Sequence, residues 1–138
     1  MTDTVSVPDR LGIERGMVVQ ELGWDEDSAE AVQTSVAERT GSELLDEAAD
    51  RTVDVVLLWW REGNGDLVDA LVDAVGPLAE NGVIWVLTPK SGRDGYVEPS
   101  DIAEAASIAG LPQTSSISVS ADWAGSRLVA PKTAKVQR

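Results

Sequence analysis

The run VDVVLLWW at residues 53–60 constrains the fold of this chain more than any other stretch of the sequence. Apart from Asp54, every residue in it is β-branched, aliphatic or aromatic. Apolar residues therefore point to both sides of the strand, which is typical of a strand buried on both faces of a mostly parallel sheet. Such a sheet needs helices on each side, so the run predicts a three-layer α/β sandwich.

The flanking sequence alternates in the way this architecture requires. Further strands are expected at 17–21 and 83–88, with a weaker one at 42–45. One helix is expected to start at an Asp27 N-cap and end at Gly41, and the next to start at Asp66 and stop near Gly76. A third helix is expected to run from Ser100 to Gly110. Two terminal strands, 114–120 and 126–130, are close enough to form an antiparallel hairpin.

The domain boundaries follow from the same pattern. Residues 1–10 are expected to form a flexible arm, residues 11–131 a single α/β domain, and residues 132–138 a basic tail. No run of about 18 apolar residues occurs, and the start of the chain lacks an apolar leader. These features predict a soluble, cytoplasmic protein that does not associate with a membrane.

Composition removes several kinds of chemistry. The chain has no cysteine and no histidine, which excludes thiol nucleophiles, disulfides, imidazole bases and zinc sites with Cys or His ligands. No metal site is predicted, since the cluster at 25–27 lacks the spaced ligands of a calcium loop. No catalytic residue is predicted either.

The net charge of −13 argues against nucleic acid as a ligand, because a phosphate backbone would be repelled. Residues 21–54 carry eleven carboxylates against two arginines. This acidic face could bind a basic protein partner, or it could simply be a solvated surface.

The loops after the predicted strands contain the candidate binding residues. In an open α/β sheet, ligands bind beyond the carboxyl ends of the strands. Segments 22–24, 60–65 and 90–96 should meet there and bring together Arg61, Lys90 and Arg93. These cations could bind a small anion such as a phosphate or a carboxylate. Acidic residues in the same loops could instead neutralise them, namely Glu62, Asp66 and Asp94.

Tryptophan is unusually frequent, with five residues and no phenylalanine. Trp59 and Trp60 must face opposite sides of the sheet, so at most one of them lines a given cleft, and Trp60 is the one next to Arg61. Trp85 is expected in the core. Trp24 and Trp123 fall in predicted connections, which makes them candidates for contact with a ligand or a partner.

The order of elements and two strings, DVVLL at 54–58 and PLAENGVIWV at 77–86, resemble class I S-adenosylmethionine-dependent methyltransferases. The resemblance spans residues 16–131 and implies a Rossmann-like, methyltransferase-like sheet that ends in an antiparallel hairpin. It also implies a glycine-rich cofactor loop after the first strand, where this chain keeps only Gly23, followed by the bulky Trp24. The acidic residue that the family places after its second strand would be Asp46 or Glu47.

Longer strings, DVVLLWWR, NGVIWVLTPKSGRDG, VEPSDIAEAA and DWAGSRLVAPK, resemble an uncharacterised family of small proteins from high-GC Gram-positive bacteria. That family implies no assigned activity. The sequence therefore favours a non-catalytic binding or regulatory protein without a cofactor, which acts by protein contact or by binding a small anion. The alternative is an S-adenosylmethionine-dependent methyltransferase with a divergent cofactor pocket.

Overall fold

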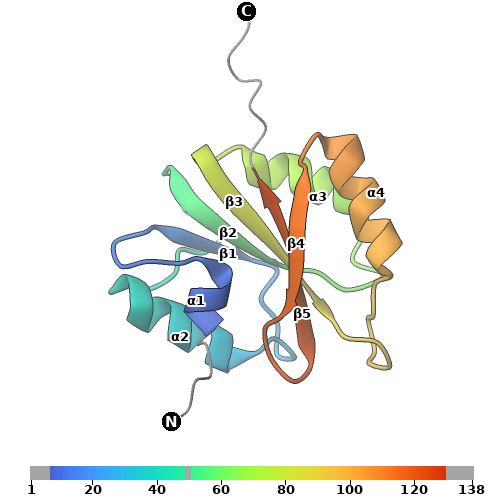
Figure 1. Cartoon of the computed structure of the whole chain (residues 1–138), viewed down its shortest axis with the longest axis horizontal. Coiled ribbons are helices and arrows are strands. Elements are labelled where there is room, and N and C mark those ends of the chain that lie inside the picture. The colour runs from blue at the N-terminus through green and yellow to red at the C-terminus, as the bar shows by residue number, and fades with distance from the viewer. Residues whose placement is uncertain (1–6, 49–50, 130–138) are drawn as a thin grey trace, which may run out of the picture.

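A computed structural model describes residues 7–48 and 51–129, in which helices surround one central sheet (Figure 1). The helices of this part of the chain are α1 (Val7–Leu11), α2 (Glu30–Thr40), α3 (Leu67–Val75) and α4 (Pro99–Ala109). Its strands are β1 (Val19–Leu22), β2 (Val53–Trp59), β3 (Leu78–Pro89), β4 (Gln113–Ser118) and β5 (Trp123–Val129).

The sheet has the strand order β1-β2-β3-β5-β4. β2 pairs in parallel with β1 and with β3, whereas β5 pairs antiparallel with both β3 and β4. Four strands thus run in one direction and β5 in the other, which confirms the mostly parallel sheet and the terminal antiparallel hairpin. The carboxyl ends of β1, β2 and β3 consequently lie at the same edge of the sheet as the start of β5.

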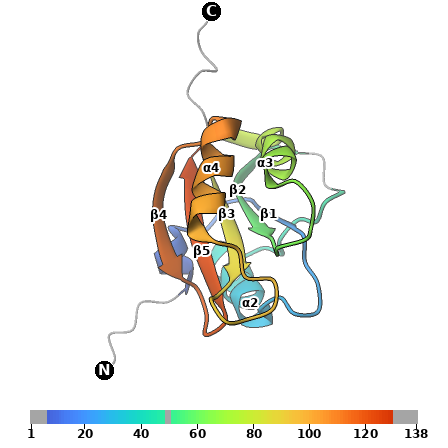
Figure 2. The ribbon, with the colours of Figure 1, turned by 90° about the vertical axis from the view of Figure 1, so that its right-hand side faces the viewer.

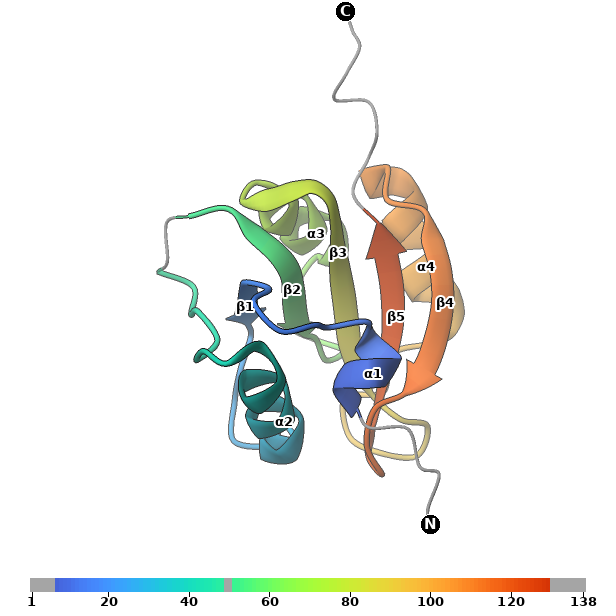
Figure 3. The same cartoon turned by 60° about the vertical axis from the view of Figure 1, so that its left-hand side comes forward.

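Helices cover both faces of this sheet, as the buried strand predicts. Figure 3 shows α1 and α2 in front of the sheet and α3 and α4 behind it. Alternate residues of β2 supply the two cores: Leu57 and Trp59 pack on the α1 and α2 side, and Val56 and Leu58 pack on the α3 and α4 side. The three-layer α/β sandwich is therefore confirmed.

Two helix ends match their sequence signals. The Asp66 side chain accepts a hydrogen bond from the backbone N–H of Val68 at 2.9 Å, so Asp66 is the predicted N-cap of α3. Gly41 follows α2 in the left-handed conformation, with a φ of 87°, and its N–H donates to the carbonyl of Ala37.

The predicted start of α2 at Asp27 is wrong. The helix begins at Glu30, and its N-cap residue, Ala29, makes no side-chain hydrogen bond. Asp27 lies in the preceding loop, where its carboxylate binds Arg61 instead. The guanidinium binds both oxygens of the carboxylate, whereas a cap would offer it a single backbone N–H, which explains why the capping signal failed.

Three boundaries also differ from the expectations. α1 begins at Val7, within the segment 1–10 that was predicted to be a flexible arm, and its Leu11 is buried in the core. The predicted strand at 42–45 is reduced to one parallel bridge between Leu45 and Gln20. β5 begins at Trp123, so this residue is not in the connection. The predicted tail 132–138 and residues 1–6 lie outside the described residues.

None of the helices in the described ranges is long and apolar enough to cross a membrane.

Candidate functional site

The three loop segments expected at the carboxyl edge of the sheet do meet. Arg61, two residues after the end of β2, donates from Nη1 to the carbonyl of Gly23, which follows β1, at 2.9 Å. The backbone N–H of Glu62 donates to the carbonyl of Gly95, in the loop after β3, at 2.9 Å. The parallel strands therefore bring together residues that lie more than thirty positions apart in the sequence.

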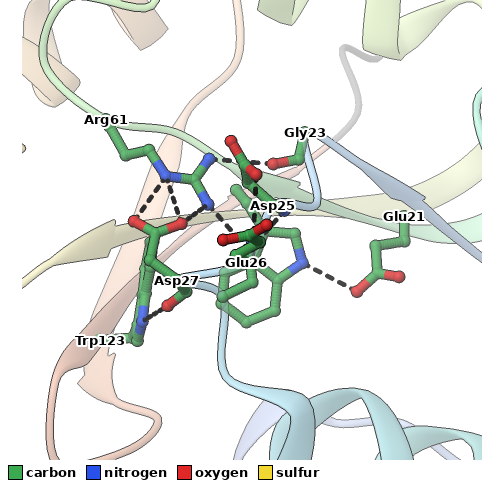
Figure 4. A network of polar contacts seen from close by, with 9 residues as sticks. Glu21, Gly23, Asp25, Glu26, Asp27, Arg61 and Trp123 are labelled. Atoms are coloured by element: carbon green, nitrogen blue, oxygen red, sulfur yellow. Dashed lines mark hydrogen bonds and ion pairs between the residues drawn. The ribbon is translucent and has the colours of Figure 1, made fainter.

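Arg61 is the centre of this edge, and its partners are within the protein (Figure 4). Its Nε lies 3.1 and 3.0 Å from the two carboxylate oxygens of Asp27, and its Nη2 lies 2.6 Å from Oδ1. Nη2 also donates to the Ser28 hydroxyl at 2.8 Å. With only 13% of its side chain exposed, Arg61 has most of its five N–H groups engaged by the fold and is not a free anion ligand.

The Arg61 guanidinium lowers the pKa of the Asp27 carboxylate that it binds. Hydrogen bonding to Arg61 is the main reason that the pKa of Asp27 falls below its ordinary value of 3.8. Partial burial of the carboxylate opposes this shift, and the positive charges of Arg61 and Arg93 add to it. Asp27 is therefore ionised in the folded protein at neutral pH and acts as a fixed counter-ion.

Three tryptophans pack beneath this ion pair. The Arg61 guanidinium lies 5.2 Å from the ring centre of Trp123, a cation–π distance. Trp123 meets Trp59 edge to face with centroids 4.8 Å apart, and Trp59 meets Trp24 in the same manner at 5.6 Å. Trp59 and Trp123 are buried, whereas Trp24 is 40% exposed.

Glu21 is a buried carboxylate that the sequence analysis missed. One of its oxygens accepts a hydrogen bond from Trp59 Nε1 at 2.8 Å, and the other accepts one from the Gln33 amide at 2.6 Å. Both oxygens therefore hold β2 and α2 against β1. The only signal in the sequence is an acidic residue inside an expected strand, and that signal does not identify its partners.

Gly23 is needed for a close backbone approach. Its φ is 77°, and a Cβ atom at this position would lie 2.3 Å from the carbonyl oxygen of Trp59. Its N–H donates to the carboxylate of Glu47 at 3.2 Å. The glycine thus lets the β1 loop pack directly onto the end of β2.

The other predicted site residues lie elsewhere. Lys90 donates to the Ser118 hydroxyl at 2.5 Å, and Arg93 pairs with Asp122 at 3.1 Å. Each of the three candidate cations is thus held by a different partner. Within the described part of the chain, none of them pairs with the carboxylates that were expected to neutralise them, namely Glu62, Asp66 and Asp94. Trp60 is half-buried and packs on the α3 and α4 side of the sheet, away from the other tryptophans.

A cavity adjoins this edge beside β1. It has a volume of about 480 Å³, and Glu21, Trp24, Asp46 and Glu47 contribute to its lining. Across residues 7–48 and 51–129, no group of three or more carboxylates converges in a way that would hold a metal ion.

The fold is similar to that of solved methyltransferases. A 1,6-didemethyltoxoflavin-N1-methyltransferase from Burkholderia thailandensis superposes with a TM-score of 0.58 and 13% identity, covering 91% of this chain and 75% of that one. A SAM-dependent methyltransferase from Aquifex aeolicus gives a TM-score of 0.55 and 16% identity, covering 89% and 87%. At these identities the likeness shows the fold alone, and it confirms the methyltransferase-like sheet.

Closer relatives define the family. The chain belongs to the family described as protein of unknown function DUF3052, which matches residues 8–132. The uncharacterized protein Rv2239c of Mycobacterium tuberculosis is 57% identical over 124 residues, which are 90% of this chain and 78% of that protein. The predicted membership in a family of high-GC Gram-positive bacteria is therefore confirmed.

Proposed function

We propose that this protein is a non-catalytic binding or regulatory protein built on a methyltransferase-like scaffold, which acts by protein contact or by binding a small anion. One observation carries the proposal: the edge where the resemblance places a cofactor is filled by the chain's own groups. Arg61 bonds to Asp27, Ser28 and the Gly23 carbonyl and covers the face of Trp123.

The residues at this edge do not fit S-adenosylmethionine in the way the resemblance implies. A cofactor loop needs small residues whose backbone can approach the ligand, but Gly23 is packed against the Trp59 carbonyl and its N–H is donated to Glu47. Glu47 is one of the two acidic residues that would have bound the cofactor. These contacts support a scaffold that works without S-adenosylmethionine.

Two carboxylates of the edge, Glu21 and Asp27, also lack the freedom that acid–base catalysis requires. Both oxygens of Glu21 accept hydrogen bonds, and the carboxylate of Asp27 is held by Arg61 with a lowered pKa. A general base works best with a pKa near the working pH and with access to substrate. A chain without histidine or cysteine has few other candidates.

The second candidate is a methyltransferase with a divergent cofactor pocket. The shared fold and the cavity of about 480 Å³ beside Trp24 favour it. In that case the cofactor would have to bind outside the Gly23 loop, against Asp46 and the exposed face of Trp24.

Isothermal titration calorimetry of the full chain with S-adenosylmethionine and S-adenosylhomocysteine separates the two candidates. We expect no saturable heat from either compound. Micromolar binding that is weakened in Trp24→Ala but retained in Val72→Ala, an exposed apolar control on α3, would overturn the non-catalytic proposal. For the protein-contact version, pull-down of the intact protein from its own cells should recover a reproducible partner.

Two further points remain proposals. The net charge of −13 supports the expectation that nucleic acid is not a ligand. We also propose that the protein works in the cytoplasm and does not associate with membranes, which fractionation of the bacterial cell would test.

A further inference from the structure

A cavity of about 570 Å³ lies on the α3 side of β1, the first strand in the sheet order. Its lining includes Gln20 on β1, Arg51 in the segment before β2 and Asp73 on α3. In Figures 2 and 3, α3 lies nearer to β1 than α4 does. We propose that this cavity, which we call the Gln20 cavity, binds a small free amino acid. The inference goes beyond the proposed function, because it adds a ligand class and a site away from the Arg61 ion pair.

A buried amide oxygen without a partner carries the inference. Gln20 is only 4% exposed, and its Oε1 is the one buried side-chain polar atom of residues 7–48 and 51–129 that makes no hydrogen bond. The other end of the amide is held, since Nε2 donates to the carbonyl of Asp46 at 3.0 Å. Turning the amide over would place Oε1 against that carbonyl oxygen, so the unpaired atom is the acceptor in either case.

A buried acceptor without a donor is costly, since it has lost its bonds to water and gained none in return. Such exceptions in a folded protein call for an explanation. The neighbours of Gln20 on β1, Val19 and Glu21, pack on the α2 side of the sheet, so the Gln20 side chain lies on the α3 side, where it lines the cavity. A molecule in the cavity that carries an N–H group would supply the missing donor.

The two charged ends of an amino acid have complementary groups in the lining. Asp73 and Arg51 are exposed, and neither side chain makes a hydrogen bond or an ion pair within the described part of the chain. An ammonium group has three protons, which Gln20 Oε1 and the Asp73 carboxylate can accept. The Arg51 guanidinium can bind a carboxylate through two parallel N–H groups. Glu47 also lines the cavity, but it already accepts the N–H of Gly23.

The remaining lining sets the size and character of the ligand. Leu22 and Pro77 contribute apolar surface, which suits an aliphatic side chain. The volume lies within the range of about 300–1,000 Å³ for small-molecule sites. Trp24, to which the methyltransferase alternative assigns the cofactor, does not line this cavity. Shifts at Gln20 and at Trp24 therefore report on different sites.

The test is a titration of the ¹⁵N-labelled full chain, followed by NMR, with three matched probes. L-leucine carries both charged groups, 3-methylbutylamine lacks the carboxylate, and 4-methylpentanoate lacks the ammonium group. We expect L-leucine to cause saturable shifts of the Gln20 side-chain amide. Each of the other two probes should bind about tenfold more weakly or worse, because it leaves one charged group of the cavity without a partner.

The variants test the same three groups in the protein. Arg51→Gln and Asp73→Asn change exposed side chains, so the protein should stay folded, and each should weaken L-leucine binding about tenfold. Arg93→Gln and Asp69→Asn are matched controls, since they remove the same charges outside the cavity and should leave the affinity unchanged. Gln20→Met removes Oε1 at nearly constant volume and should also weaken binding.

Four outcomes would overturn the inference: L-leucine does not saturate below about 10 mM, the Gln20 side-chain amide does not shift, either analogue binds as tightly as L-leucine, or Arg51→Gln and Asp73→Asn bind like their controls. A parallel titration with S-adenosylmethionine keeps the two proposals distinguishable. Saturable shifts at Trp24 with that compound contradict the non-catalytic function, whereas failure of L-leucine contradicts only the Gln20 cavity.

Discussion

The exchange Gly23→Ala tests whether the glycine after β1 is there for packing within the fold. Gly23 has a φ of 77°, and an added Cβ would lie 2.3 Å from the Trp59 carbonyl oxygen, where ordinary contacts begin at 3.4 Å. Gly12 is a matched control, because its φ is 72° and an added Cβ would meet nothing within 4 Å. Comparing the two variants separates backbone strain from steric clash.

The magnitudes follow from these two geometries. A non-glycine residue in the left-handed region costs about 1–2 kcal/mol, part of which alanine recovers by restricting the unfolded chain. Gly12→Ala should therefore lose about 1 kcal/mol. Gly23→Ala bears the same cost, and the loop must also move about 1 Å away from the rigid end of β2, which adds about 2 kcal/mol in the manner of an overpacked core.

Urea unfolding followed by tryptophan fluorescence measures both variants. We expect Gly23→Ala to lose about 3 kcal/mol of unfolding free energy, a large share of the roughly 5–15 kcal/mol typical of a domain. Equal losses in the two variants would refute the close approach between Gly23 and Trp59. The glycine would then be free to serve a ligand.

Three further predictions use the same unfolding assay. Arg61→Met should destabilise the protein by about 2–3 kcal/mol, between the values for exposed and buried ion pairs, because Asp27 is half exposed. Arg93→Gln should lower the unfolding free energy by less than about 0.5 kcal/mol. Equal losses in the two variants would mean that the Arg61–Asp27 pair is no stronger than an exposed ion pair. The folded-state pKa of Asp27 is lowered, so the contribution of its ionised carboxylate to stability is present above the unfolded pKa of about 4 and is lost as the pH falls through the folded pKa. Asp27→Asn should therefore make the unfolding free energy depend less steeply on pH below about 4. An unchanged slope would count against the ion pair with Arg61. Thr88 on β3 makes no side-chain hydrogen bond to any described residue, so Thr88→Val should change stability by less than about 1 kcal/mol, whereas a clear loss would mean that the hydroxyl has a partner.

Some features of the fold could be predicted because their causes are local. The Asp66 cap and the glycine after α2 each satisfy backbone groups within a few residues, so short sequence patterns suffice to locate them. Asp27 shows the limit of this reasoning. Its spacing to Glu30 is that of a capping box, but its carboxylate binds the Arg61 guanidinium, 34 residues away in the sequence, instead.

The candidate site was only partly predictable. The carboxyl edge, Arg61 and Gly23 follow from the strand order of α/β sheets, and the structure does place them together. Which carboxylate would neutralise Arg61 could not be read from the sequence, because eleven acidic residues crowd positions 21–54.

The sequence by itself determined the three-layer α/β architecture, the buried strand at the centre of the sheet and the exclusion of thiol and imidazole chemistry. Those conclusions depend on periodicity and composition, which are properties of the chain before it folds. Only the tertiary structure decided that Arg61 is an internal ion-pair partner, that Trp59 belongs to the tryptophan cluster in place of Trp60, and that Lys90 bonds to the Ser118 hydroxyl. The physical reason is that a side chain's role depends on the partners available in three dimensions, and parallel pairing draws those partners from distant segments.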